Sequence, residues 1–233
     1  INRGLRTQVV SVSTINSQMS GVDAPEKIRN YIIQEYQQQG INYVMLAGDV
    51  EHVPYRGFYC TVQSSSVQTD DDIPSDLYYS ALDGNWNTDG DNLWGEIGED
   101  DLLPDIAVAR LPFSNSTELA NMLNKVIQYQ TNPVLGELKK PLLAAEHLYD
   151  NPATWGQQYL RLLIGHKTDN GYTTDGIPAT HNIDSLYDTP SYTWGQSDLL
   201  NKINQGFSFI HHVGHANSDY VAKMYNSDIT NTN

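Results

Sequence analysis

The apolar and polar positions of the first fifty residues alternate between strand-like and helix-like patterns. Residues 7–12 alternate with a period of two, which predicts a strand. Residues 21–40 follow helical spacing, with Asp23 and Glu26 as a capping box at the start and Gly40 as the stop. The continuous apolar run 41–47 predicts a strand that is buried on both faces. This order of elements is typical of an α/β protein.

The second half of the chain repeats the alternation. Strands are predicted at 105–110, 142–145 and 207–213, with 181–183 as a further candidate, and helices at 115–127, 154–166 and 197–203. Asn115 and Glu118 form a capping box for the first of these helices, whose predicted buried stripe comprises Leu119, Met122, Leu123, Val126 and Ile127. We therefore expect right-handed crossovers and a mostly parallel open sheet flanked by helices.

The periodic pattern lapses over about 51–104, where runs of serine (64–66) and aspartate (70–72) predict an exposed loop. We find no internal repeat and no low-complexity linker. The interpretation is one α/β domain over residues 1–233 with an irregular acidic insertion.

Charge and composition narrow the function. The formal net charge of −15 argues against a nucleic-acid partner, because few cations are present to replace the counterions of a phosphate backbone. A chain this acidic more often binds cations or simply stays soluble. No apolar run approaches the roughly 18 residues that a membrane span needs. The chain starts at Ile1 without a signal peptide, so we expect a mature or trimmed piece.

Cys60, the single cysteine, excludes an internal disulfide but leaves the cellular compartment open. It lies in a short β-like run with only Arg56 as a nearby basic residue. A half-buried structural thiol is a better interpretation there than a nucleophile.

The segment 85–96 resembles an EF-hand-type calcium loop. Oxygen-bearing side chains occupy positions 1, 3 and 5, a glycine position 6 and a glutamate position 12. These residues are Asn85, Asn87, Asp89, Gly90 and Glu96, and a competing register uses Asp83, Asn85, Asn87, Asp89 and Asp91. A solvated Asp/Asn turn is the alternative. We predict a structural Ca²⁺ site.

The strand 207–213 ends in Gly214-His215. Functional crevices of open α/β sheets lie beyond the carboxyl ends of strands, and an imidazole there suits proton transfer. A polar residue at a strand end is the plain alternative. A metal site could use His212 and His215 with His211 or Asp219 nearby, but His211 and His212 point to opposite faces of the strand and no HExxH arrangement occurs. A serine triad would need a GxSxG-type turn, and none occurs. The third possibility is a Cys–His pair, with Glu146 as a possible orienting acid or else an ordinary exposed carboxylate.

Several short blocks resemble the catalytic domain of the gingipain family of cysteine peptidases. They are residues 3–7, 41–49, 75–79, 105–112, 144–146 and 214–215, and in order and spacing they cover nearly the whole chain. The resemblance implies a caspase-like fold and a secreted or surface-bound bacterial endopeptidase acting on polypeptides. It implies that His215 is the catalytic histidine, Glu146 its acidic neighbour, and the backbone near Gly214 and Ala216 the oxyanion hole. It also implies calcium near Asp76 and in the acidic loop.

The chain departs from the family pattern in two respects. Ala216 replaces a glycine, and the family's nucleophilic cysteine would follow the histidine, beyond Asn233. We therefore expect that cysteine on a companion chain or a removed segment, and no activity from this chain alone. The resemblance implies that Arg-cleaving members use an acidic pocket residue a little after the Glu146 position. Asp150 is the nearest acid there and Gln157 lies further on, so the P1 preference stays open. The competing hypothesis is a non-catalytic, calcium-stabilised scaffold or export-related protein.

Overall fold

The computed structural model describes residues 4–63 and 66–228, which form two compact units. Residues 1–63 and 67–127 make up the first unit, and residues 64–66 and 128–233 the second. Arg3, Ser64, Ser65 and Asn233, which the sequence analysis used, lie outside the described residues. We predicted one α/β domain over residues 1–233; in the structure each of the two units has its own core.

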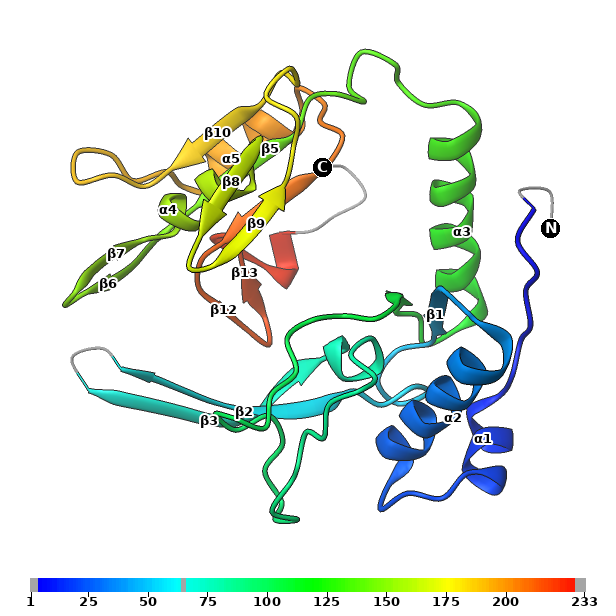
Figure 1. Ribbon diagram of the computed structural model, residues 1–233. Helices are drawn as coiled ribbons and strands as arrows, with labels where there is room; N and C mark the ends of the chain where they lie inside the picture. The colour runs from blue at the N-terminus through cyan, green and yellow to red at the C-terminus, as the bar shows by residue number, and fades with distance from the viewer. Residues whose placement is uncertain (1–3, 64–65, 229–233) are drawn as a thin grey trace. The chain divides into compact units, whose positions relative to one another are not determined.

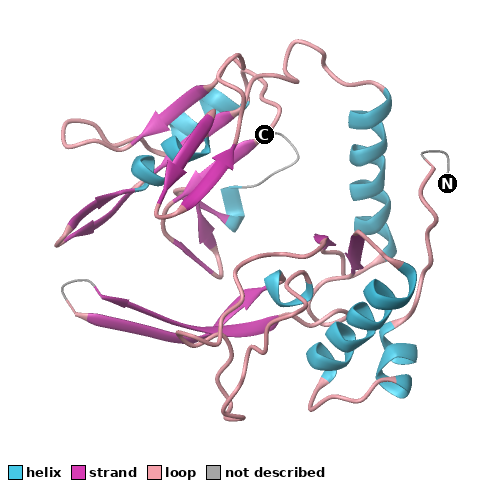
Figure 2. Cartoon of the chain, in the orientation of Figure 1, coloured by secondary structure: helices cyan, strands magenta, loops and turns pink. Residues whose placement is uncertain are grey.

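The helices and strands of the first unit come in the order shown in Figure 1. They are α1 (Val12–Gln18), α2 (Ala24–Gln39), β1 (Tyr43–Ala47), β2 (Arg56–Gln63), β3 (Val67–Ser75), the 3₁₀ helix η1 (Leu77–Tyr79) and β4 (Ala107–Leu111). Helix α3 (Ser116–Thr131) follows β4 and runs across the boundary between the units. Figure 2 shows the long irregular segment that separates η1 from β4.

Local capping signals of the first unit are confirmed. Asp23 accepts a hydrogen bond from the Glu26 amide at the start of α2, and Gly40 ends the helix in the left-handed conformation with φ 64°. The Glu26 carboxylate in turn accepts from the amide of Val22, one residue before the expected partner. Asn115 likewise accepts from the amide of Glu118 at the start of α3. Strands β1 and β4 pair in parallel, as the crossover predicted.

Three predictions for the first unit are wrong. Residues 8–11 form no strand, because Ser11 caps α1 by accepting from the Thr14 amide. Strand β1 is exposed along much of its length, with Met45 60% exposed, since among the described strands it pairs with β4 alone. The stripe on α3 contains no buried side chain. Helical spacing defines an apolar face, but burial requires a packing partner, which the pattern does not provide.

The segment 56–75 is an antiparallel hairpin of β2 and β3. The β-like run around Cys60 is confirmed as β2, whereas residues 70–72, expected in a loop, are in a strand. Its acidic residues 70–72 lie in β3 and are exposed. Backbone pairing with β2 holds this polar strand, so low hydrophobicity did not prevent strand formation. The core of the unit lies elsewhere, and its large members include Ile28, Ile32, Leu46, Tyr79 and Trp86.

The second unit is organised around β5 (Leu142–Ala145), whose four residues are buried. It is the middle strand of a parallel sheet, with β10 (Asp184–Tyr187) on one side and β11 (Ile210–Val213) on the other. Leu142 and Ala144 pack toward Leu199 of α5 (Gln196–Ile203), which Figure 1 shows beside β5 and β10. Leu143 and Ala145 pack toward Leu160 on the other face.

Smaller elements complete this unit. They are β6 (His147–Asp150), β7 (Ala153–Trp155), α4 (Gly156–Leu160), the 3₁₀ helix η2 (Arg161–Leu163), β8 (His166–Asp169), β9 (Tyr172–Asp175), β12 (Ala216–Asn217), β13 (Tyr220–Val221), β14 (Met224–Tyr225) and the 3₁₀ helix η3 (Asn226–Asp228). The strand predicted at 142–145 and the helix predicted at 197–203 are confirmed, the latter starting at Gln196 with Gly195 at its cap.

Two boundaries in this unit are wrong. The helix predicted at 154–166 is confined to α4 and η2, because Thr154 belongs to the β6–β7 hairpin and His166 begins β8. The candidate strand at 181–183 lies just before the true strand, β10. Pairing with β5 selects the residues of β10, and the run of turn formers around it hid that strand from pattern analysis.

Candidate active site

The candidate active site lies at the carboxyl edge of the β10–β5–β11 sheet. Three residues with functional side chains follow the three parallel strands. Asp188 comes directly after β10, Glu146 directly after β5, and His215 comes after β11 and Gly214. Parallel strands bring these ends to one edge, where open α/β sheets place functional groups. Glu146 and Asp188 are each 4% exposed, whereas His215 is exposed to solvent.

Glu146 is hydrogen-bonded to His212, not to His215. Its Oε1 lies 2.8 Å from His212 Nε2, and both side chains are largely buried. Register explains this choice: His212 lies opposite Ala144 in the parallel pair, so side chains two residues further along each strand share the same face. Glu146 therefore reaches diagonally back to His212, while the side chain of His215 leaves from a different position on the edge.

Gly214 is the residue that permits this contact. A Cβ atom at Gly214 would lie 2.4 Å from His212 Nε2 and 2.5 Å from the carboxyl carbon of Glu146. Neither Gly214 nor Ala216 has a positive φ, so the glycine is needed for space and not for backbone conformation. Ala216, which replaces the expected glycine, begins β12 opposite Val221 without backbone strain.

His215 contacts the β6–β7 hairpin. Its Nε2 lies 3.2 Å from the carbonyl oxygen of His147, and its ring stands edge-on to Tyr149 with the centroids 6.3 Å apart. A carbonyl oxygen can only accept, so a hydrogen bond there requires the proton on Nε2 of the neutral ring. Nδ1 is then the basic nitrogen. This arrangement suits an imidazole that receives a proton from a nearby group.

The two residues that we expected near the substrate-selecting position both lie in the second unit, shortly after Glu146 in the sequence. Asp150 ends β6 with a fully exposed carboxylate, 3.6 Å from His147 Nε2. Gln157 lies in α4 and is partly buried. Gly156, which begins α4, packs against the carbonyl oxygens of Val213 and Glu146, so this short helix is fixed to the edge.

Sequence reasoning assigned no role to three residues at this edge, His147, Asp188 and Lys223, and considered His212 only as a possible metal ligand. Asp188 accepts from the amides of His147 and Trp194 and from Lys223 Nζ. Burial and the neighbouring Glu146 carboxylate raise the pKa of Tyr220, which lies close by. A carboxylate directly after a strand was the available signal for Asp188, but the strand itself was not located from the sequence.

The predicted calcium ligands lie in the first unit and separate into groups. Asp89, Asp91 and Glu96 come together, with their ligand atoms within 4.8 Å of one another. Burial and then the charges of Asp91 and Asp89 raise the pKa of Glu96. Oxygens that bind one Ca²⁺ at 2.3–2.6 Å have similar mutual separations, so this group fits the ion. Asn85 and Asn87 stabilise the same loop, since their side chains accept from the amides of Asn87 and Gly90.

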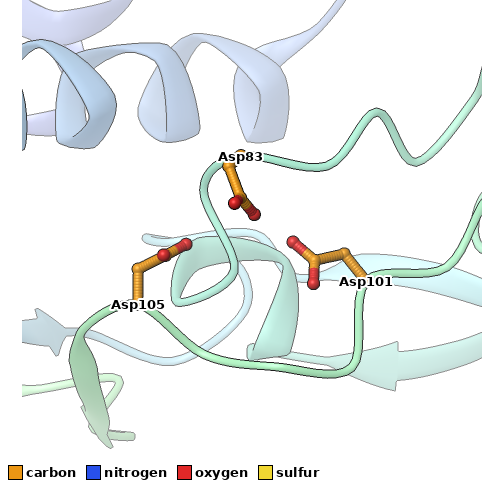
Figure 3. A group of neighbouring side chains, drawn as sticks. All are labelled: Asp83, Asp101 and Asp105. Carbon is orange, nitrogen blue, oxygen red and sulfur yellow. The ribbon is translucent and has the colours of Figure 1, made fainter.

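Asp83 belongs to a second group, with Asp101 and Asp105. Figure 3 shows the three carboxylates converging, and their ligand atoms lie within 4.8 Å of one another. A hydrogen bond to Asp101 and then the charge of Asp105 raise the pKa of Asp83. The residues Asp101 and Asp105 were not among the predicted ligands.

Asp76 lies outside both groups. Both of its carboxylate oxygens accept from Arg110, at 2.8 and 2.7 Å. Arg110 also donates to the carbonyls of Gly48 and Val53, so it links Asp76, at the start of η1, to the turn that follows β1. Cys60, the single cysteine, lies partly buried in β2 of the first unit.

The parallel sheet with an exposed histidine at its carboxyl edge agrees with the caspase-like α/β fold that the family resemblance implies. The profile of peptidase family C25 matches residues 1–233, and the chain therefore belongs to this family of cysteine peptidases. No helix in the described ranges is long and apolar enough to cross a membrane.

Curated relatives and solved structures agree with this assignment. Lys-gingipain of Porphyromonas gingivalis is 28% identical over 146 residues, which cover 60% of this chain and 7% of that protein; Lys-gingipain 381 matches equally. The crystal structure of the Arg-specific cysteine proteinase gingipain R superimposes with a TM-score of 0.57 at 20% identity, over 96% of this chain and 44% of that one. A complex of RgpB pro- and mature domains matches to the same extent. The chain thus spans less than half the length of these relatives.

Proposed function

We propose that this chain is the histidine-bearing part of a gingipain-like cysteine endopeptidase. The observation that carries the proposal is the hydrogen bond from His215 Nε2 to the carbonyl of His147 at the carboxyl edge of the sheet. It leaves Nδ1 of an exposed imidazole as the base. The nucleophilic cysteine would lie beyond Asn233, on a companion chain or a segment removed by processing, and this chain alone would be inactive.

The reaction proposed is acyl transfer through a thiolate. His215 accepts the thiol proton, and the resulting thiolate attacks the carbonyl carbon of a peptide bond. The imidazolium then returns the proton to the amine as the amine departs. The product of this step is an acyl-enzyme, which water hydrolyses. Backbone amides near Gly214 and Ala216 would stabilise the oxyanion. Glu146 acts through position: its pair with His212 fixes the backbone that leads directly into His147.

Substrate binding would involve the residues that flank this edge. The exposed carboxylate of Asp150 and the side chain of Gln157 in α4 are the candidates for contact with a polypeptide substrate. Membership of family C25 supports a polypeptide substrate, and the complex of pro- and mature domains in a structural relative supports a companion chain. We also propose that the protein works outside a bacterial cell, secreted or bound to its surface.

Calcium would stabilise the first unit. Asp89, Asp91 and Glu96 fit one Ca²⁺ by donor type and spacing, and the side chains of Asn85 and Asn87 hold their loop. Asp83 belongs to the separate group with Asp101 and Asp105, and Asp76 is held by Arg110, so neither is part of this proposed site. Within the described structure, the buried Oε2 of the adjacent Glu99 has no hydrogen-bond partner, while its other oxygen accepts from the Asp89 amide. An ion there would offset the mutual repulsion of these carboxylates and supply no catalytic step.

The decisive experiment is His215→Ala in the full-length polypeptide from the source, including whatever follows residue 233. Loss of general base catalysis is expected to reduce peptidase activity by about 10²- to 10⁴-fold. His211→Ala is the matched control, since His211 is also exposed and lies on β11, the strand that leads to His215. The thermal stability of both variants should match that of the parent.

Two results contradict the proposal. Retained activity in His215→Ala excludes His215 as the base. A parent protein without peptidase activity and without a cysteine that reacts with an electrophilic label favours the non-catalytic scaffold or export-related alternative. Within residues 1–233, the one thiol is Cys60 in the first unit, which is why the label must be applied to the longer polypeptide.

A further inference from the structure

The proposed mechanism makes no use of Asp188, although Asp188 is among the most buried charged residues of the described chain. It is 4% exposed and follows β10 directly. Its Oδ2 accepts from the His147 amide at 3.0 Å, its Oδ1 from the Trp194 amide at 3.0 Å, and both accept from Lys223 Nζ at 2.9 and 2.8 Å. A buried carboxylate with this many donors is an organising centre for the backbone around it.

Lys223 neutralises this carboxylate from an unusual backbone position. Ala222 and Lys223 form the two-residue turn between β13 and β14, with φ angles of 53° and 58°. Both central positions of such a turn favour glycine or asparagine, and other residues adopt the left-handed conformation only at an energetic cost. The ammonium group of Lys223 offsets this cost: besides Asp188, it contacts the Trp194 carbonyl at 2.9 Å and lies 4.3 Å from the Trp194 ring.

The contact with His147 connects this ion pair to the proposed base. The amide of His147 donates to Asp188, and the carbonyl of the same residue lies 3.2 Å from His215 Nε2. One residue therefore has its N–H anchored to a buried carboxylate and its C=O directed at the imidazole. The turn that carries Lys223 follows His215 in the chain. The Asp188–Lys223 pair therefore joins the segment after His215 to the backbone of His147, which Asp188 also holds.

We propose that Asp188, paired with Lys223, is a positioning residue for His215: it anchors His147 so that the His147 carbonyl holds the imidazole in the Nε2–H form with Nδ1 free. The positioning is a property of this chain, while its catalytic meaning rests on the proposed function. Asp188 does not contact substrate in this scheme and acts only through the backbone of His147.

The test is Asp188→Asn, with Asp184→Asn as its matched control. Asp184 lies at the start of β10, the strand that Asp188 follows, and pairs with Lys202 at 2.7 Å, so the control also removes a salt-bridge carboxylate. In ¹⁵N-histidine-labelled full-length protein, the nitrogen chemical shifts of His215 report its tautomer. Asp188→Asn is expected to convert a predominant Nε2–H form into a mixture, and Asp184→Asn to leave it unchanged.

Activity provides a second readout. Misplacement of the base is expected to lower kcat of Asp188→Asn by about 10- to 100-fold, with KM within about twofold of the parent because Asp188 does not contact substrate. If the unpaired Lys223 prevents folding, the double variant Asp188→Asn with Lys223→Met removes both charges and is expected to show the same tautomer mixture.

A purely structural role predicts a different pattern. In that case the foldable variant has a lower melting temperature, but its His215 tautomer and kcat match those of Asp184→Asn, and the proposal is overturned. The tautomer comparison needs no peptidase activity. A His215→Ala protein that keeps its activity would therefore remove the proposed function while the anchoring of His147 by Asp188 still stands or falls on the NMR result.

Discussion

Both units bury charged side chains, but the sign of the buried charge differs. The charged residues below 9% exposure in the described chain are Arg29 and Arg56 in the first unit and Glu146 and Asp188 in the second. Removing any charge from water is costly, so each must be paired or hydrogen-bonded where it lies. The two units meet this requirement with different partners.

In the first unit, buried arginines organise irregular backbone. Arg29 donates to the carbonyls of Ala81 and Gly84, at the start of the acidic loop. Arg56 forms a two-point contact with Asp23, and its guanidinium lies 4.0 Å from the centre of the Trp94 ring. Backbone carbonyls and aromatic faces both favour cations, so Arg29 holds the unpaired backbone at 81–84, and Arg56 packs against Trp94 in the acidic loop.

In the second unit, the buried carboxylates lie at strand ends beside a histidine and a lysine. Glu146 and Asp188 accept from side chains and backbone amides at the edge that also presents His215. The comparison shows that burial of charge alone does not identify a functional site. In the second unit the buried carboxylates lie at the carboxyl edge of a parallel sheet, next to an exposed titratable ring. This position makes the second unit the one suited to chemistry.

The largest predicted effect is on the arginine network. Arg56→Met removes two hydrogen bonds to Asp23 and the contact with Trp94, and we expect it to lower the free energy of unfolding of the first unit by about 3 kcal/mol. Urea titration followed by tryptophan fluorescence measures this loss. Arg6→Met, at an exposed arginine of the same unit, should change it by less than about 0.5 kcal/mol. Equal effects from the two variants would show that Arg56 does not organise the core.

The second largest effect is that of calcium, which should stabilise the first unit and not the second. At a Ca²⁺ concentration of 100 times Kd, binding is expected to stabilise the first unit by about 2.7 kcal/mol, and chelator should reverse this in a thermal melt. Asp91→Asn should abolish the response, whereas Asp71→Asn, in the exposed part of β3, should keep it. A melting temperature that is the same with Ca²⁺ and with chelator would contradict the calcium proposal.

Gly214→Ala tests the spacing at the carboxyl edge. The added methyl group would collide with the Glu146–His212 pair, so we expect a destabilisation of about 2 kcal/mol together with reduced peptidase activity of the full-length protein. Gly136→Ala is the control, because its Cβ would meet open space and its φ is not positive. A Gly214→Ala protein as stable and active as the control would show that the edge tolerates separation of the pair.

The smallest effect concerns acid stability of the first unit. Burial opposes ionisation of Asp23, but hydrogen bonds from Arg56 and from the Glu26 amide outweigh it, so the pKa of Asp23 lies below its usual value. Because the folded pKa is depressed, this contribution to stability is present above the unfolded pKa of about 3.9 and is lost as the pH falls through the folded value.

Asp23→Asn should therefore flatten the loss of stability below about pH 4. Asparagine still caps the helix and still offers one oxygen to Arg56, so we expect loss of the charge to lower stability at pH 7 by about 1 kcal/mol. Urea unfolding at a series of pH values measures both quantities, with Asp71→Asn as the exposed control. The same acid slope in Asp23→Asn as in the parent would assign that slope to other groups.

The sequence by itself determined the features that depend on neighbours along the chain. Capping by Asp23 and Asn115, the left-handed stop at Gly40, the buried run of β5 and the strand that leads to Gly214 each involve residues within a few positions of one another. The order of strands and helices then placed Glu146 and His215 at the ends of neighbouring strands. These signals are local, so the chain pattern contains them in full.

Only the tertiary structure decided which groups meet. His212 and Glu146 are 66 residues apart in sequence, and Asp188 and His147 are 41 apart. Their pairing depends on the register of β10, β5 and β11, and a shift of one residue would turn each side chain to the other face. The exposure of α3 has the same origin, because burial depends on a packing partner that helical spacing does not specify. Strand β3 differs, since its partner β2 is its neighbour in the sequence: backbone pairing in the hairpin makes it a strand although its side chains are polar.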